Sequence, residues 1–205
     1  MIEYFEEGRV YEVVLVTLSN AATVGVSRKG GVLVFRLFGG KSSEEIKKHP
    51  FVSVQITNDV ELLVKLALNM KSNLEFGEFG MWRHIRGLPG IFGRVEFRER
   101  VWRDEFGESK ILECVMTPEG EIEGSLPLRP FSRADSALLE MAVHFTRLPL
   151  AIKTGNGELI NKLSSKIEEY YGLHRHLGGK SELAEFMMTR MQELLHGLRR
   201  KTYNQ

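Results

Sequence analysis

The strongest constraint on the fold of this chain is a change in the spacing of its apolar residues near residue 130. Before that point, short segments rich in β-branched and aromatic residues recur at 10–18, 32–38 and 51–57, and the last of these alternates apolar with polar residues. After it, apolar residues recur every three or four positions, which is typical of amphipathic helices. We therefore expect a β domain over residues 1–130 and a helical segment over residues 131–205.

The remaining strand signals favour a barrel. Further strands are predicted at residues 24–26, 94–103 and 110–117, and the last two flank a hairpin connection at residues 104–107. Short strands that recur at this pace are typical of a closed barrel and not of a parallel βαβ sheet. The predicted fold class is mainly β with α, a barrel followed by a C-terminal helical segment.

Other segments are expected to interrupt the strands. Ser42 and Glu45 have the spacing of a capping box, so a short helix should begin at Ser42, and Pro50 should end it. Residues 59–69 fit either a helix or a strand. Residues 70–93 are rich in Gly and Pro and are predicted to form an irregular loop.

Three helices are predicted in the C-terminal part of the chain. They cover residues 136–147, residues 159–170 and a segment that begins after Ser181, which is a good N-cap, and Gly172 is expected to end the second of them. The last two helices should form an antiparallel hairpin that packs on the barrel.

Composition excludes several classes of function. Lys plus Arg is 28 and Asp plus Glu is 27, a balance that lacks the strong basic face of a nucleic-acid-binding protein. The single cysteine, Cys114, excludes an intramolecular disulfide framework, and the pair His174 and His176 has no further ligand at metal spacing. No apolar run approaches the ~18 residues of a membrane span, and the N-terminus has no signal sequence, so a cytoplasmic location is expected.

A predicted anion site follows the strand at 32–38. Gly39 and Gly40 let the backbone approach a ligand, Lys41 brings a positive charge, and Ser42 and Ser43 offer hydroxyls and amides at a helix N-terminus. This pattern predicts a phosphate cradle, although it lacks the spacing of a Walker loop. The alternative is an ordinary strand–turn–helix connection with a Ser cap.

A second candidate segment consists of small residues beside a strand. Asn20, Ala21, Ala22 and Thr23 would let a flat ring lie against the backbone and exchange hydrogen bonds with peptide groups. A ring held by these residues and a phosphate held by residues 41–43 would together describe a mononucleotide-like flavin.

These residues resemble motifs of the flavin-reductase-like FMN-binding split barrels, and more closely those of a mostly archaeal group of FMN-binding proteins among them. The resemblance is carried by Asn20-Ala21-Ala22-Thr23-Val24-Gly25-Val26, Lys41-Ser42-Ser43-Glu44-Glu45-Ile46, Arg129-Pro130-Phe131-Ser132-Arg133-Ala134 and Glu140-Met141-Ala142-Val143-His144-Phe145-Thr146-Arg147-Leu148. Thr23 stands where the pattern has proline, and Glu45 and Ser132 stand where it has asparagine. The resemblance implies a split barrel that binds FMN.

The resemblance also implies a function and an assembly. The chain would be a flavin-dependent oxidoreductase that works as a homodimer and takes electrons from a nicotinamide or a deazaflavin. The alternative is a non-catalytic flavin-binding or protein-interaction module. The cofactor-binding residues would be Asn20, Ala21, Ala22, Thr23, Arg36, Lys41, Ser42, Ser43, Asp59 and Arg133.

Several further residues have more than one interpretation. Arg36 points into the site or to solvent, Asp59 contacts the ligand or caps a helix, and Arg133 reaches the phosphate, a partner subunit or a surface ion pair. Trp82 and His84 cover the ring or pack on the barrel. Glu45 would repel FMN if it turned inward, and the favoured interpretation is that it caps its own helix.

Overall fold

The computed structural model describes residues 1–5, 7, 10–105, 107–124 and 133–203, without the side chains of residue 133 and residues 199–203. These residues form two units. The barrel unit comprises Met1–Asp59, Lys71–Arg103 and the strand that follows Glu108. The helical unit comprises Val60–Met70, the hairpin tip Asp104–Gly107 and the C-terminal helices.

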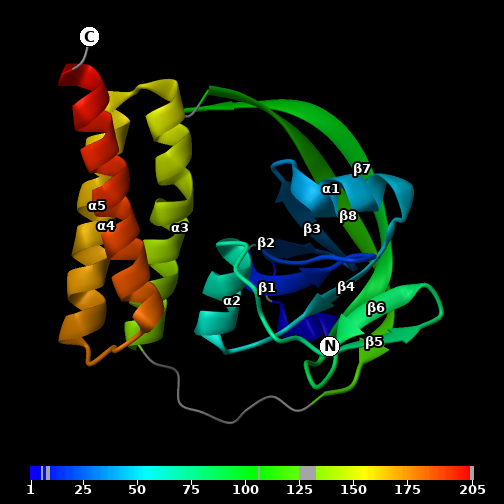
Figure 1. Ribbon diagram of the computed structural model, residues 1–205. Coiled ribbons are helices and arrows are strands. Elements are labelled where there is room, and N and C mark those ends of the chain that lie inside the picture. The colour runs from blue at the N-terminus through cyan, green and yellow to red at the C-terminus, as the bar shows by residue number, and fades with distance from the viewer. Residues whose placement is uncertain (6, 8–9, 106, 125–132, 204–205) are drawn as a thin grey trace. The chain divides into compact units, whose positions relative to one another are not determined.

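Six strands close the barrel (Figure 1). They are β1 (Val10–Val16), β2 (Ala21–Lys29), β3 (Val32–Leu37), β4 (Phe51–Gln55), β7 (Gly90–Asp104) and β8 (Gly107–Ile122). Their order around the barrel is β1-β2-β3-β8-β7-β4, with β4 paired antiparallel to β1. The predicted fold class is confirmed. Most strands lie where the sequence places them, but β2, β7 and β8 are longer than predicted.

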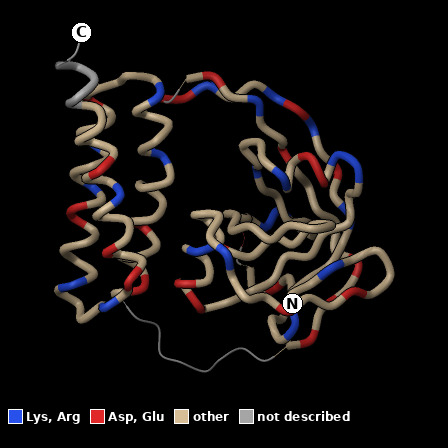
Figure 2. The backbone as a smooth tube through the Cα atoms, viewed as in Figure 1, with Lys and Arg blue, Asp and Glu red and all other residues tan. Residues whose placement is uncertain are grey.

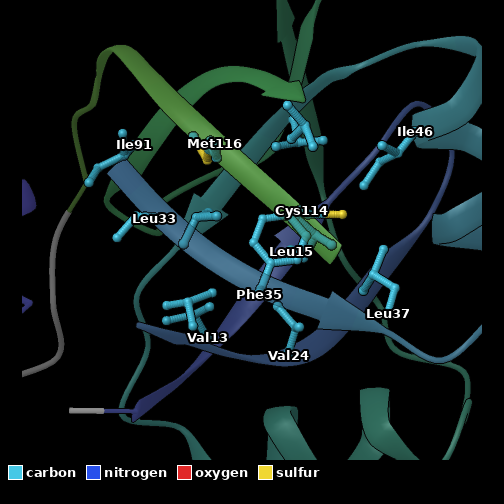
Figure 3. Close-up of a cluster of buried hydrophobic side chains, with 14 of the residues drawn as sticks. Val13, Leu15, Val24, Leu33, Phe35, Leu37, Ile46, Ile91, Cys114 and Met116 are labelled. Atoms are coloured by element: carbon cyan, nitrogen blue, oxygen red, sulfur yellow. The ribbon is translucent and has the colours of Figure 1, made fainter. Parts of the chain in front are cut away.

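The barrel interior is filled by alternate residues of these strands (Figure 3). In β1, Val13 and Leu15 belong to the interior cluster together with Leu33 and Phe35 of β3. Cys114 of β8 joins them, and burial raises the pKa of its thiol to about 12. This cysteine is therefore a small core residue at neutral pH.

The Gly/Pro-rich segment 70–93 is not the irregular loop that was predicted. It contains the hairpin β5 (Phe76–Phe79) and β6 (Trp82–Ile85) and the first residues of β7. Trp82 stacks on Phe79 at a centroid distance of 5.8 Å, lies 4.8 Å from the ring of Phe92, and donates its indole N–H to the Gly93 carbonyl. These aromatic contacts hold the hairpin to the barrel and override the turn-like composition.

The helical unit contains α2 (Val60–Ala67), α3 (Arg133–Thr154), α4 (Gly157–His176) and α5 (Glu182–Tyr203). The segment at 59–69 is thus a helix, and Val60 and Val64 of α2 pack in one cluster with Leu138 and Met141 of α3. A linear boundary at residue 130 therefore does not describe α2, which belongs with the C-terminal helices. No described helix is long and apolar enough to cross a membrane.

Two helix ends differ from expectation, and one agrees. The helix α3 continues through Pro149, and α4 continues through Gly172, which has no side chain within reach of an added Cβ. Ser181 caps α5 as predicted, because its hydroxyl accepts a hydrogen bond from the backbone N–H of Leu183 at 3.2 Å.

Figure 2 shows acidic and basic residues interspersed along the chain.

Candidate functional site: the first β-hairpin and the start of α1

Residues 38 and 39 connect β3 to the helix α1 (Gly40–Lys48). Gly39 and Gly40 have φ angles of 80° and 81°, which glycine adopts without strain. Gly39 is the N-cap residue and has no side chain that could cap the helix. The helix begins at Gly40, two residues before the predicted start at Ser42. Pro50 follows the end of the helix, as predicted.

The start of α1 lies against the connection between β1 and β2. Asn20 donates a hydrogen bond from Nδ2 to Oγ of Ser42 at 2.9 Å, and Lys41 donates from Nζ to the Ser19 carbonyl at 3.3 Å. Ser42 is 5% exposed, whereas the Lys41 side chain is 57% exposed. The structure therefore brings together the two segments that were predicted separately from the sequence, the small-residue segment and the anion site.

Glu45 does not cap its own helix. Its carboxylate accepts hydrogen bonds from the Thr17 hydroxyl at 2.5 Å, from the Ser19 backbone N–H at 2.9 Å and from the Ser19 hydroxyl. Burial acts to raise the pKa of this carboxyl, but the hydrogen bonds from Ser19 and Thr17 and the charge of Lys41, 3.9 Å away, outweigh it and the pKa is lowered. The capping-box interpretation is therefore wrong, because the tertiary donors compete successfully for the carboxylate.

The first turn of α1 presents a favourable position for an anion. The amides at a helix N-terminus carry the positive end of the helix macrodipole. A hollow of about 170 Å³ opens beside Gly39, Gly40 and Ser43, and its charged lining is mixed, with Lys47, Lys110, Glu44 and Glu99. Ser43 is buried and donates its hydroxyl proton to the Gly39 carbonyl at 3.1 Å, which fixes the side chain at the base of this turn.

The small-residue segment is the start of β2, and its register decides which side chains face outward. Ala22 lies opposite Leu15 of β1, a residue of the barrel interior, so the Ala22 side chain is on the interior face. Ala21 lies opposite Val16 and, with Thr23, is on the other face. A ligand on the outside of this hairpin would therefore meet Ala21 and Thr23, and would meet Ala22 only through its backbone.

Of the other predicted site residues, Arg36 and Asp59 have described contacts elsewhere. Arg36 is on the outer face of β3, where its guanidinium lies 3.8 Å from Glu113 and 4.5 Å from the ring centroid of Trp102. Asp59 directly precedes α2, and its backbone N–H donates to the Thr57 hydroxyl. The side chain of Arg133 and the adjoining residues 125–132 lie outside the described part of the chain.

Arg83 is a residue of the site that the sequence did not indicate. It lies on β6, its guanidinium covers the Phe76 ring at 3.9 Å, and Nη1 donates to the Leu18 carbonyl at 3.3 Å. A cavity of about 230 Å³ beside this contact is lined by Leu18, Trp82 and other residues. The sequence predicted an irregular loop over residues 70–93 and no strand at 82–85. It therefore gave no reason to place Arg83 next to the first hairpin.

His174 has a structural role in the helical unit. Its Nδ1–H donates to the Ala134 carbonyl at 2.9 Å, and Nε2 accepts from the Ser181 backbone N–H at 3.3 Å. The ring is buried, and in this arrangement one nitrogen donates and the other accepts. Both nitrogens are used by backbone groups, which leaves neither for a metal ion.

The fold and site define a small closed β-barrel with a polar site between its first hairpin and its first helix. The chain belongs to the family described as protein of unknown function DUF447, because the model of the family's N-terminal domain matches residues 11–123 and a second model of the family matches residues 132–190. The resemblance predicted from the sequence is thereby confirmed as a family membership.

Two similar proteins have archaeal sources. An uncharacterised protein of Methanocaldococcus jannaschii, MJ1453, is 26% identical over 197 residues, which is 90% of this chain and all of the relative. The crystal structure of the FMN-bound DUF447 protein MM1853 of Methanosarcina mazei aligns with a TM-score of 0.65 and 22% identity, over 95% of this chain and all of that chain. This second likeness shows that the fold is shared.

Proposed function

We propose that this protein binds FMN, with the ring on the outer face of the hairpin start at Ala21 and Thr23 and the phosphate at the first turn of α1. The observation that carries this proposal is the hydrogen bond between Asn20 and Ser42, which holds a small-residue strand start next to a helix N-terminus. The FMN bound to MM1853, a protein of the same family and fold, supports it.

The residues present fit such a ligand. The first-turn amides of α1 and the Lys41 ammonium favour a phosphate, and the half-buried side chains of Ala21 and Thr23 are small enough for a flat ring to approach the strand. The buried Ser42 hydroxyl is already ordered by Asn20, so it needs little rearrangement on binding. Glu45 does not oppose this fit, because its carboxylate is directed to Thr17 and Ser19.

The oxidoreductase role is part of the same proposal. When bound, FMN supplies hydride and electron transfer, and the protein supplies binding, orientation and electrostatics. The chain's own contribution would be to hold the ring on the outer face of the first hairpin, where a nicotinamide or deazaflavin donor can approach it.

We also propose that two copies of the chain assemble. Two hollows next to the site are about 170 and 230 Å³, each smaller than the ~300 Å³ at which ligand sites usually begin, and a second chain would add to the enclosure of FMN. The long hairpin of β7 and β8 carries apolar side chains that are exposed in one chain, including Phe97 and Val101.

One experiment tests the binding proposal, and a second tests the activity. The purified protein should carry a yellow ligand that has the mass of FMN, or the apo-protein should bind added FMN. Failure of both would overturn the proposal. Reduction of the bound flavin by a nicotinamide or deazaflavin donor, followed by transfer to an acceptor, would establish an oxidoreductase. Tight FMN binding without reduction by either donor would instead support the non-catalytic module.

A further inference from the structure

The connection between β1 and β2 is held by side chains from outside the hairpin. Three donors of this connection, the Thr17 hydroxyl and the Ser19 backbone N–H and hydroxyl, converge on the Glu45 carboxylate. The Glu45 side chain is 13% exposed, whereas its neighbour in the ion pair, Lys41, is 57% exposed. This carboxylate is therefore a largely enclosed acceptor and not a surface charge.

The geometry makes an ionised carboxylate the fitting acceptor. Two carboxylate oxygens accept all three hydrogen bonds, whereas a glutamine in the same place would turn an N–H group toward at least one of these donors. Hydrogen bonds to a charged acceptor are also stronger than those between neutral groups. A glutamine at position 45 would keep these contacts only as weaker hydrogen bonds between neutral groups, with the Ser19 hydroxyl turned to accept from its amide, and an alanine would remove them.

We propose that Glu45 is a positioning residue of the flavin site: it fixes residues 17–20 against α1, so that the ring segment and the phosphate segment form one preorganised site. This inference rests on the proposed FMN binding. Glu45 acts through Thr17 and Ser19 and does not touch the ligand itself. Preorganisation raises affinity because the ordering of the loop is no longer a cost of binding.

A Glu45 carboxylate that repels the phosphate and one that positions the loop would change ligand affinity in different ways. If Glu45 acted chiefly as a negative charge near the phosphate, its removal would tighten the binding of FMN and leave riboflavin, which has no phosphate, unchanged. If Glu45 positions the loop that holds the ring, its removal weakens FMN and riboflavin by similar factors. The sign of the change and the comparison of the two ligands therefore separate the roles.

The test is a titration of wild-type apo-protein, Glu45→Gln and Ser19→Ala with FMN and with riboflavin, followed by flavin fluorescence. We expect Glu45→Gln to weaken both ligands by about tenfold or more, the effect of losing hydrogen bonds to a charged acceptor. Ser19→Ala removes one donor without changing any charge and should weaken both ligands in the same direction. The double variant should lose less than the product of the single losses, because both changes break one network.

The titration has a matched control variant and outcomes that would contradict the positioning role of Glu45. Glu96→Gln removes the same charge from an exposed position on β7 and should leave both affinities unchanged. Unchanged affinities in Glu45→Gln and Ser19→Ala, or tighter FMN binding in Glu45→Gln, would overturn the inference while leaving FMN binding in place. Absence of flavin binding by the wild-type protein would instead reject the proposed function.

A ligand-free measurement covers the case in which Glu45→Gln folds poorly. Hydrogen exchange of the Ser19 amide reports the bond to Glu45 directly, and it should be slow in the wild-type protein and faster in Ser19→Ala, whose remaining bonds are weakened. A Ser19 amide that exchanges as quickly as an unprotected loop in the wild-type protein would contradict the positioning role.

Discussion

Lys41 is the charged residue on which the proposed phosphate site depends most directly. Its ammonium is exposed, reaches the Ser19 carbonyl and is 3.9 Å from Glu45. Lys41→Glu should weaken FMN binding by about tenfold to a hundredfold, because repulsion replaces a charge-assisted contact, with a small change in stability. Affinity and melting temperature should be measured together, with Lys48→Glu at the other end of α1 as the control. Equal effects of the two substitutions would contradict the site.

Ala21 and Ala22 are adjacent in sequence but are on opposite faces of β2. A ring beside Ala22, as the sequence alone suggests, would be blocked by Ala22→Leu, but the register puts that half-buried side chain on the interior face of the barrel. We therefore expect Ala21→Leu to weaken FMN binding at nearly unchanged melting temperature. Ala22→Leu should instead lower the free energy of unfolding by about 1–3 kcal/mol through overpacking. Flavin titration and urea unfolding of both variants check this, and reversed effects would contradict the outward ring.

The sequence was informative about which residue types the site contains and less so about where they point. Asn20 and Ser42 belong to the two segments that the sequence indicated, and the structure shows that their side chains are hydrogen-bonded, whereas their role in holding a ligand stays a prediction. The direction of Glu45 could not be predicted, since the capping-box spacing describes only local donors. Its actual partners, Thr17 and Ser19, are more than 25 residues away in sequence.

At the scale of elements, the turn between α4 and α5 depends on the close approach of a glycine to His174. A Cβ at Gly179 would lie 2.2 Å from the His174 ring, which is held by hydrogen bonds on both sides. Gly179→Ala should therefore lower the free energy of unfolding by about 1–3 kcal/mol. Gly172→Ala, inside α4 with open space around it, should raise it by up to about 1 kcal/mol. Thermal or urea unfolding measures both, and destabilisation by Gly172→Ala would show that this position is constrained.

The contact between α1 and the first hairpin should make stability depend on pH. The pKa of Glu45 is lowered in the folded protein, with Thr17, Ser19 and Lys41 facing the carboxylate. Its contribution is therefore complete above the ordinary carboxyl pKa and is lost as the pH falls through the lowered, folded-state value. The stability difference between wild-type protein and Glu45→Gln, measured by urea unfolding from neutral to acidic pH, should shrink on acidification. A difference independent of pH would mean that the charge of Glu45 is not what holds this contact.

At the scale of the whole molecule, the change of apolar spacing near residue 130 was sufficient to predict a barrel followed by helices. It could not assign α2, because a segment of eight residues with an amphipathic pattern fits a strand or a helix and says nothing about its partner. Packing of Val60 and Val64 with α3 decides that question. The hairpin of β5 and β6 was missed for a similar reason, since it depends on the aromatic contacts of Trp82 with Phe79 and Phe92.

The proposed dimer is a prediction about the whole molecule, and the exposed apolar side chains of the β7 and β8 hairpin make it testable. Phe97 and Val101 are 40% and 55% exposed and share one face of β7. We expect sedimentation at micromolar concentration to give a particle of twice the 23.4 kDa chain mass. The double substitution of Phe97→Ser and Val101→Ser should shift it toward the monomer, because a stable interface needs roughly 800 Å² per chain with an apolar centre. Both side chains are exposed, so the folded state of each chain should persist, which circular dichroism would verify. Weaker FMN binding by this monomeric variant would show that the second chain helps to enclose the ligand, whereas a wild-type monomer that holds FMN tightly would contradict the dimer.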